Sequence, residues 1–498
     1  MKNLIPLLLF VLVFYLVLGS IEVRAVPLAT LIDRALANNL ALKMEKLRIE
    51  EQAFDEKRTE NAMIPNLDGS LSHQRQSYVD PSPAAFFGSQ YYQTVFSFQL
   101  VQKYPALGRI PRIDRDLARL RTQYQKTVAD RFATELRRQV IRLFFDLLQE
   151  RELAKVDEEN IGLLRQLLEV ARINRDVGLA LPNDILRIEA QKANLESSLT
   201  TRGFLQENFR IDLANLLNIE NQSELEIDLP PSIVFPLSQP QKATILEALL
   251  KKDHDIELAR QDVAIVRLAV DSARSANLPS LNLGGQYNFT DAKGGNRNAR
   301  DYGVSMSLDF PIFDSGDHKN NVLKANKMMA RLELALENLT KLKKAALNKA
   351  WTDYQEMAPK LNFAQIAVAQ SFENMRMIVT RYRHGDATIV ELVDAQITMS
   401  SAAQNAVKIH HDERIRLSEL YILSQDPAIR GVDAGAVSLP KFTIETFETA
   451  PVPPESGLAL PQNPLPDLFQ TDIGVDPGGV IYRVIINTTR IVNTPFGK

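Results

Sequence analysis

A helical pattern of about 66 residues, at positions 317–382, constrains the fold of this chain more than any other feature. At 1.5 Å per residue such a helix would be about 100 Å long. Helices of ordinary globular domains rarely exceed about 20 residues, so this one predicts an elongated, coiled-coil-like assembly. The helical patterns on either side, 243–276 and 389–424, together span about 70 residues. Stacked end to end, they would cover the long helix over its whole length.

Short segments of alternating apolar and polar residues lie between the helical patterns. Each half of the chain has two of them: 67–75, 92–100, 281–289 and 302–310, the first with only a weak pattern. Period-two alternation over about nine residues is typical of outer-membrane barrel strands, although a half-buried sheet of a soluble protein is the commoner cause. In the three clear segments the polar positions are small and, apart from Asp309, uncharged, which favours a wall that faces water.

Four strands cannot close a barrel on their own. An open strand edge in lipid leaves backbone N–H and C=O groups unpaired, and each unpaired group costs several kcal/mol. If these strands cross a membrane, several copies of the chain must therefore pool them.

The first 25 residues carry the pattern of a secretory signal peptide. Lys2 precedes an apolar run, Leu4–Leu18, and Val23-Arg24-Ala25 offers a cleavage site after Ala25. The alternative is an N-terminal membrane anchor, but this run is shorter than the roughly 20 residues that a helix needs to span a bilayer. We therefore expect an exported protein.

The composition narrows the class of function. The 498 residues are 45 % apolar and 24 % charged, which excludes a disordered chain and a polytopic helical membrane protein. The net charge of −3 disfavours nucleic acid as a partner, and the absence of cysteine excludes disulfides and thiolate metal sites. Phosphate-binding-loop, zinc-protease and nucleophile-elbow motifs are absent from the sequence. We expect no catalytic residue, no cofactor and no metal site, so any transport would be passive.

The sequence also indicates an internal duplication. Ala35 and Ala248 open similar helical patterns, and Pro65 and Pro279 precede similar strands at almost the same separation along the chain. Each copy is expected to contain a short helix, two strands, a very long helix and a second short helix. The predicted divisions are a signal peptide (1–25), a first repeat (26–220), a Pro-rich linker (221–240), a second repeat (241–426) and a Pro-rich tail (427–498).

These features, in this order and duplicated, resemble the TolC-like outer-membrane efflux family. The resemblance covers about residues 28–426 and rests on the strand starts at Pro65 and Pro279, the strand exit Phe310–Gly316 and the segment Tyr382–Gln396. It implies a mixed α and β fold that is predominantly α. Three chains, each with four strands, would form one twelve-stranded outer-membrane β-barrel, continued by a long α-helical periplasmic barrel. It also implies two partners, a periplasmic adaptor protein and an inner-membrane pump.

By resemblance, a periplasmic entrance gate lies after the longest helix of the second repeat. Glu391 and Asp394 are three residues apart and therefore share a helical face, where three chains would form a ring of six carboxylates. The alternative is an ordinary solvated acidic face. Tyr382 and Asp184 match positions that help to lock the closed entrance. The arginine that can pair with this acid in the family is replaced here by Ala387, which leaves Arg383 as a substitute.

The turns between the long and short helices are predicted to be helix-hairpin tips. Glycine suits any such turn, and by resemblance the tips also contact the adaptor. The residues concerned are Val177, Gly178, Leu179, Gly385 and Asp386.

Several aromatic and histidine positions have simpler interpretations. His410 and His411 are neighbours on a helix, where side chains point about 100° apart and share an ion poorly, so we expect a solvated pair. Trp351 and Phe144 lie at apolar positions of long helices and are expected in the core.

The function expected from these observations is that of an outer-membrane channel in a tripartite efflux or type I secretion system. It would passively conduct substrates that the pump and the adaptor deliver. A periplasmic coiled-coil tether without a pore is the first alternative, and an enzyme with a non-standard site is the second. A tether would leave membranes with salt or alkali, whereas a barrel would need detergent.

Overall fold

A computed structural model describes residues 28–77, 90–176, 178, 181–219, 242–293 and 299–424. All of them lie in the larger of two structural units, Met1–Glu448. The predicted signal peptide, linker and tail fall outside these residues and stay predictions.

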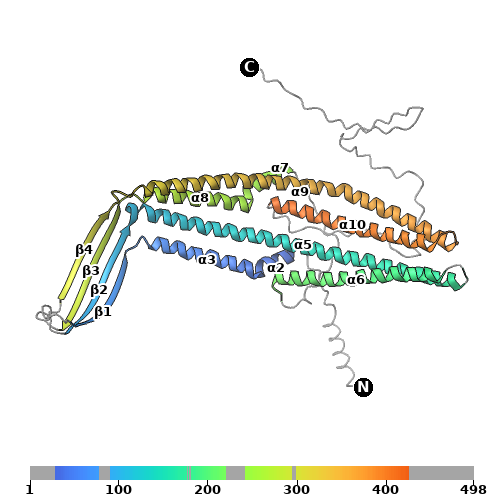
Figure 1. Cartoon of the computed structure of the whole chain (residues 1–498), viewed down its shortest axis with the longest axis horizontal. Coiled ribbons are helices and arrows are strands. Elements are labelled where there is room, and N and C mark those ends of the chain that lie inside the picture. The colour runs from blue at the N-terminus through green and yellow to red at the C-terminus, as the bar shows by residue number, and fades with distance from the viewer. Residues whose placement is uncertain are drawn as a thin grey trace, which may run out of the picture. The chain divides into compact units, whose positions relative to one another are not determined.

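The two halves of the described chain have the same order of elements (Figure 1). The first half consists of α2 (Leu28–Asn38), α3 (Leu40–Asn61), β1 (Asn66–Ser77), β2 (Gln90–Tyr104), the short 3-10 turn η1 (Pro105–Gly108), α5 (Arg109–Asp176) and α6 (Pro182–Leu217). The second half consists of α7 (Lys242–Lys252), α8 (His254–Ser275), β3 (Ser280–Lys293), β4 (Ala299–Asp309), α9 (Asp317–Arg383) and α10 (Ile389–Ser424). Corresponding helices have nearly equal lengths, with 68 and 67 residues in α5 and α9 and 36 in both α6 and α10.

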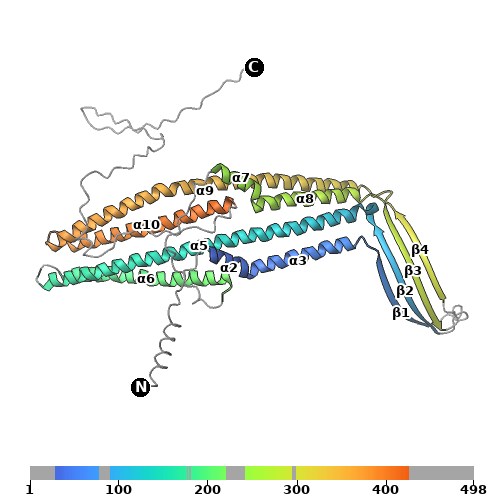
Figure 2. The same cartoon turned by 180° about the vertical axis from the view of Figure 1, so that it is seen from behind.

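The long helix of the second half is confirmed, since α9 begins at Asp317 and ends at Arg383. α8 packs along the half of α9 nearer the sheet and α10 along the other half, while α3 and α6 divide α5 in the same way (Figures 1 and 2). Two shorter helices placed in succession thus cover each long helix.

The prediction of one continuous helix over 243–276 is wrong. α7 ends at Lys252 and α8 begins at His254, because the Asp253 carboxylate accepts a 3.0 Å hydrogen bond from the Ile256 N–H and caps a new helix. Asn39 makes the matching break between α2 and α3, where its side-chain oxygen accepts a 3.0 Å hydrogen bond from the Leu42 N–H.

The four predicted strands are confirmed and form one antiparallel sheet in the order β1-β2-β3-β4. In the central rows, Phe96 of β2 pairs with Leu71 of β1 and with Phe289 of β3. Within this sheet β1 pairs only with β2, and β4 only with β3, so both outer strands keep one unpaired edge.

The two faces of the sheet differ sharply in chemistry. The register places one set of side chains, here called the apolar face, on one side of the sheet: Leu67, Leu71, Phe96, Phe98, Leu100, Leu283, Tyr287, Phe289, Tyr302, Val304, Met306 and Leu308. The opposite side, here called the polar face, carries Asp68, Ser70, Ser72, Gln74, Gln93, Ser97, Gln99, Asn282, Gln286, Asn288, Asp301, Ser305, Ser307 and Asp309. Much of the apolar face is bare in the single chain, as shown by Val304, which is 91 % exposed.

The helical core is formed where the long helices meet the shorter ones. One cluster, around Leu164, Met375 and Leu392, lies between the two hairpins near their tips. A second cluster contains Phe144 and joins α5 to α2, α6 and α10, so its expected burial is confirmed. Trp351 is half-buried against a third, smaller cluster.

The prediction of a solvated histidine pair is wrong. His411 is fully buried and His410 is 8 % exposed, because this face of α10 packs against α5. The Nε2 atom of His411 lies 3.0 Å from the Oε2 atom of Glu152.

Among the helices that the structure describes, none is both long enough and apolar enough to cross a membrane.

Candidate functional site

The two helix hairpins, α5–α6 and α9–α10, turn at the end of the helical region that lies away from the sheet (Figure 1). Gly178 and Gly385 occupy these turns with φ angles of +81° and +83°. No atom lies within 4 Å of a Cβ built on either glycine, so the backbone conformation, and not a lack of space, requires glycine there. Val177 and Leu179 lie outside the described residues, and Asp386 is exposed beside Gly385.

Asp184 and Glu391 both cap the helix that follows their turn. The Asp184 carboxylate accepts a 2.8 Å hydrogen bond from the Leu181 N–H at the start of α6. The Glu391 carboxylate accepts hydrogen bonds from the N–H (2.8 Å) and the hydroxyl (3.2 Å) of Thr388 at the start of α10. The bond from the Thr388 N–H is the main reason why the pKa of Glu391 is lowered. The two acids thus have a local structural role besides any role in a gate.

Asp394 follows Glu391 by three residues, and both side chains are exposed. The buried residues Leu392 and Val393 lie between them and point into the core of the hairpins. The predicted acidic face is therefore present at the surface of α10.

Tyr382 brings the two hairpins together. It lies at the end of α9, is only 8 % exposed, and packs in the core cluster that both hairpins share. Burial raises the pKa of its hydroxyl, the Asn174 side chain of α5 opposes this shift, and the negative charge of Asp184 adds to it. The charge of Asp184, on the first hairpin, thus acts on the Tyr382 hydroxyl of the second hairpin, while their joint role in a gate stays a prediction.

The position expected for an arginine holds Ala387, which is partly buried against the core cluster. Arg383 is exposed. Arg381 was not among the predicted site residues, but its Nη2 donates a 2.9 Å hydrogen bond to the Asp386 carbonyl and its charge also lowers the pKa of Glu391. A basic residue in the last turn of a helix was the available signal.

Away from the tips, α10 and α5 meet through a row of polar side chains, here called the polar seam. Gln396 donates to Asn160 over 2.8 Å, and Gln404 donates to Asp157 over 2.7 Å. The pair of His411 and Glu152 continues the seam. Asp157, Asn160, Gln396 and His411 are fully buried. These bonds join a helix of the first half to a helix of the second.

Asp157 is the most heavily bonded member of the seam. Besides Gln404 it accepts hydrogen bonds from Nε of Arg202 at 2.5 Å and from the Ser198 hydroxyl at 3.0 Å, both on α6. A fully buried carboxylate needs such partners because burial strongly disfavours an unpaired charge.

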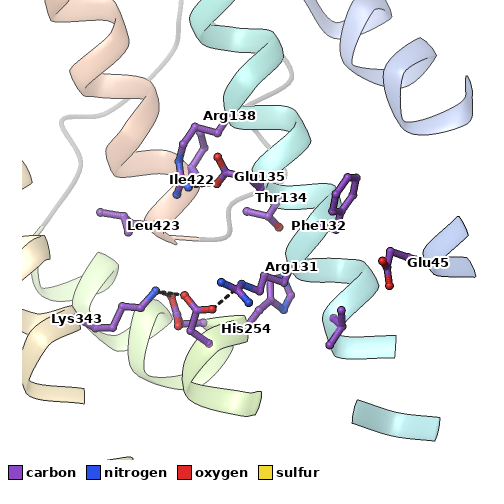
Figure 3. Close-up of a pocket in the computed structure, with 13 residues that line it drawn as sticks. Glu45, Arg131, Phe132, Thr134, Glu135, Arg138, His254, Lys343, Ile422 and Leu423 are labelled. Carbon is purple, nitrogen blue, oxygen red and sulfur yellow. Dashed lines mark hydrogen bonds and ion pairs between the residues drawn. The ribbon is translucent and has the colours of Figure 1, made fainter. Parts of the chain in front are cut away.

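A pocket of about 390 Å³ lies where α3, α5, α8, α9 and α10 meet (Figure 3). At its floor Lys343 contacts Asp253 at 3.2 Å and Asp255 at 2.5 Å, and Arg131 contacts Asp255 at 2.8 Å. Burial raises the pKa of Asp255, but the hydrogen bond and charge of Lys343 outweigh it, so the net shift is downward. Because these charged groups form ion pairs with one another, we interpret the pocket as a junction between the two halves of the chain.

Residues 245–424 match the sequence model of a family described as outer membrane efflux protein. The resemblance to the TolC-like outer-membrane efflux family is confirmed. The outer membrane efflux protein BepC of Brucella suis is 19 % identical to this chain over 388 residues, which cover 76 % of the chain and 81 % of BepC.

Solved structures share the fold of this chain. The CmeC outer membrane channel of Campylobacter jejuni matches with a TM-score of 0.71 at 17 % identity, covering 82 % of this chain and 87 % of CmeC. The outer membrane protein VceC of Vibrio cholerae matches with a TM-score of 0.69 at 15 % identity, covering 81 % of this chain and 96 % of VceC.

The family match assigns the chain to the outer membrane, with the described helices as its large periplasmic part. Outer membrane efflux proteins are channels, so the enzyme alternative is set aside.

Proposed function

We propose that this chain is the outer-membrane channel of a tripartite efflux or type I secretion system, and that it passively conducts substrates supplied by an inner-membrane pump and a periplasmic adaptor. The observation that carries this proposal is the four-stranded sheet with one apolar and one polar face. Such a sheet suits a wall with lipid on one side and water on the other.

The unpaired edges of β1 and β4 support an oligomer. Pairing β4 of one copy with β1 of the next would satisfy the edge N–H and C=O groups that lipid leaves without partners. By family resemblance the ring has three copies and twelve strands, with α5, α6, α9 and α10 of each copy forming a periplasmic tunnel.

The matched order and lengths of the elements support an internal duplication, with repeats at 26–220 and 241–426. The separation in sequence between the turn glycines Gly178 and Gly385 equals that between the capping acids Asp184 and Glu391. Duplication of a half that supplies two strands and one helix hairpin would explain why the turn glycine and the capping acid both recur.

The hairpin tips are the proposed gate and adaptor-docking region. In a trimer, Glu391 and Asp394 would place six carboxylates around the tunnel axis, favouring cations and divalent ions over small anions. Tyr382 and Asp184 would hold the two hairpins of one copy in the closed arrangement. The exposed turns at Gly178, Gly385 and Asp386, with Val177 and Leu179 beside them in sequence, would meet the adaptor.

Extraction and sizing test this function against the tether alternative. We expect the protein to stay in outer-membrane fractions after salt and alkali, to dissolve in detergent, and to have the native mass of a trimer. Release by alkali as a monomer would favour the tether.

A further inference from the structure

Most acidic residues of the four strands lie on the face opposite the two arginines. Three carboxylates, those of Asp68, Asp301 and Asp309, lie on the polar face, and a fourth, that of Asp291 in β3, lies on the side of the apolar face. The arginines of the strands, Arg75 in β1 and Arg300 in β4, lie instead on the same side as the apolar face. A guanidinium on a lipid-facing surface needs an explanation, because the destabilisation that it causes rises steeply toward the middle of the membrane.

Both arginines lie toward the end of the sheet that is away from the helices. β2 runs from this end to the start of α5, and Arg75 pairs with Tyr92, twelve residues before Tyr104 at the helical end. At about 3.3 Å per residue and a tilt of 35–45°, twelve residues rise about 28–32 Å. If an apolar band about 25 Å tall begins at the level of Tyr104, Arg75 stands just beyond it.

Arg300 lies lower on the sheet. It pairs with Phe289, which pairs with Phe96 of β2, eight residues before Tyr104. The same arithmetic gives a rise of about 19–22 Å, in the outer part of the apolar band. From there its long side chain reaches the headgroup level.

Aromatic rings hold both guanidinium groups against the sheet. The Arg75 guanidinium lies 5.5 Å from the centre of the Tyr92 ring, and that of Arg300 lies 5.5 Å from the centre of the Phe289 ring. Both arginines are exposed, and among the described strand residues neither forms an ion pair, although Asp291 lies on the same side of β3, two residues from Phe289. A stacked guanidinium keeps its N–H edge free for a planar, bidentate contact with an anion such as phosphate.

Closure of the barrel would bring these arginines together. Within one chain β2 and β3 separate them, so they are three strand spacings, about 14 Å, apart across the sheet. If β4 of one copy pairs with β1 of the next, Arg300 and the next copy's Arg75 stand on adjoining strands, about 4.8 Å apart across the sheet, with rises above Tyr104 that differ by about 10 Å.

We propose that Arg300 of one copy and Arg75 of the next form a site for the phosphate groups of phosphorylated lipids in the outer leaflet. His73, which lies on the same side of β1 and whose Nδ1 is 2.9 Å from the Thr94 hydroxyl, flanks this site. The inference rests on the proposed function, because only a membrane-inserted and closed ring places the two arginines beside lipid headgroups.

Lipid retention tests the site. The assembled protein is purified in mixed micelles that contain bis-phosphorylated lipid A or its dephosphorylated form, and bound lipid is counted by native mass spectrometry. We expect several-fold more of the phosphorylated lipid on the wild type. R75Q/R300Q should abolish this preference, and R75K/R300K should keep part of it. The control K103Q removes a cation of β2 near the helical end and should retain lipid as the wild type does.

Equal retention of the two lipids by the wild type, or an unchanged preference in R75Q/R300Q, would overturn the site. Binding of inorganic phosphate together with equal retention of the two lipids would indicate a site for free phosphate instead. Conductance of the same samples in planar bilayers separates the two proposals: channels without a lipid preference would refute only the site, whereas absence of channels would refute the proposed function.

Discussion

The acidic residues at the hairpin tips combine two physical roles that sequence alone does not separate. Glu391 caps α10 through Thr388, and Asp184 caps α6 through the Leu181 N–H. A substitution that removes the carboxylate therefore alters the helix start as well as the charge. Glutamine can accept the same capping hydrogen bond without a charge, so it isolates the electrostatic role of Glu391.

The double variant E391Q/D394N should therefore keep the helix and lose the charge of the proposed gate. We expect its permeability ratio for cations over anions to fall at least about twofold and block by divalent cations to weaken, because the proposed trimer would lose six carboxylates. Single-channel recording in salt gradients measures both. E169Q, which neutralises an exposed acid of α5, is the control and should behave as the wild type. An unchanged permeability ratio in E391Q/D394N would remove these residues from the gate.

Asp255 gives the stability a defined dependence on pH. Despite burial, its contacts with Lys343 and Arg131 lower its pKa in the folded protein. The ionised group therefore stabilises the fold at pH values above about 3.9, its unfolded pKa, and this contribution is lost as the pH falls through the lower folded pKa.

D255N should thus be less stable than the wild type at pH 7 by about 1–2 kcal/mol, since it removes hydrogen bonds to charged groups. The difference should shrink as the pH falls below about 4. Thermal unfolding in detergent, followed by circular dichroism, provides the comparison. A difference that stays constant from pH 7 to acid would contradict the assigned ion pairs.

At the scale of elements, the polar seam joins the two halves through buried polar side chains, each of which needs its hydrogen-bond partners. Asp157 is buried and relies on Arg202 of α6 and Gln404 of α10. Removing one partner of a buried ion pair leaves an uncompensated charge, which is strongly destabilising.

R202M should destabilise the fold by about 3–5 kcal/mol, and R202M/D157N should recover part of this loss because it also removes the buried charge. K251M breaks the exposed pair with Glu247 and should leave the stability nearly unchanged. Denaturant unfolding of the three variants measures these differences in stability. Equal, small changes in the free energy of unfolding of R202M and K251M would show that the buried ion pair of the polar seam stabilises the fold no more than an exposed pair does.

Sequence periodicity predicted α9, α10 and the four strands, because the 3.6- and 2-residue patterns are local properties of each element. It missed the helix break at Asp253, since one capped residue barely disturbs the pattern around it. It also misplaced His411, whose burial depends on α5, a helix from the other half of the chain. The acidic face of Glu391 and Asp394 followed from their spacing, whereas the contacts of Glu391 with Arg381 and Thr388 required the fold of the turn.

At the scale of the whole molecule, the two faces of the sheet and its two open edges require a common explanation. A single chain leaves the apolar face and the edges of β1 and β4 uncovered, although water and lipid each suit only one face. The proposed ring of several copies would satisfy both demands and enclose the polar face. Its carboxylates, Asp68, Asp301 and Asp309, would make the enclosed passage attractive to cations.

Planar-bilayer recording of the purified protein tests this account most directly. We expect discrete current steps with a preference for cations, because each inserted ring of copies would enclose one water-filled passage. Protein that inserts stably into the bilayer but never produces a current step would contradict it.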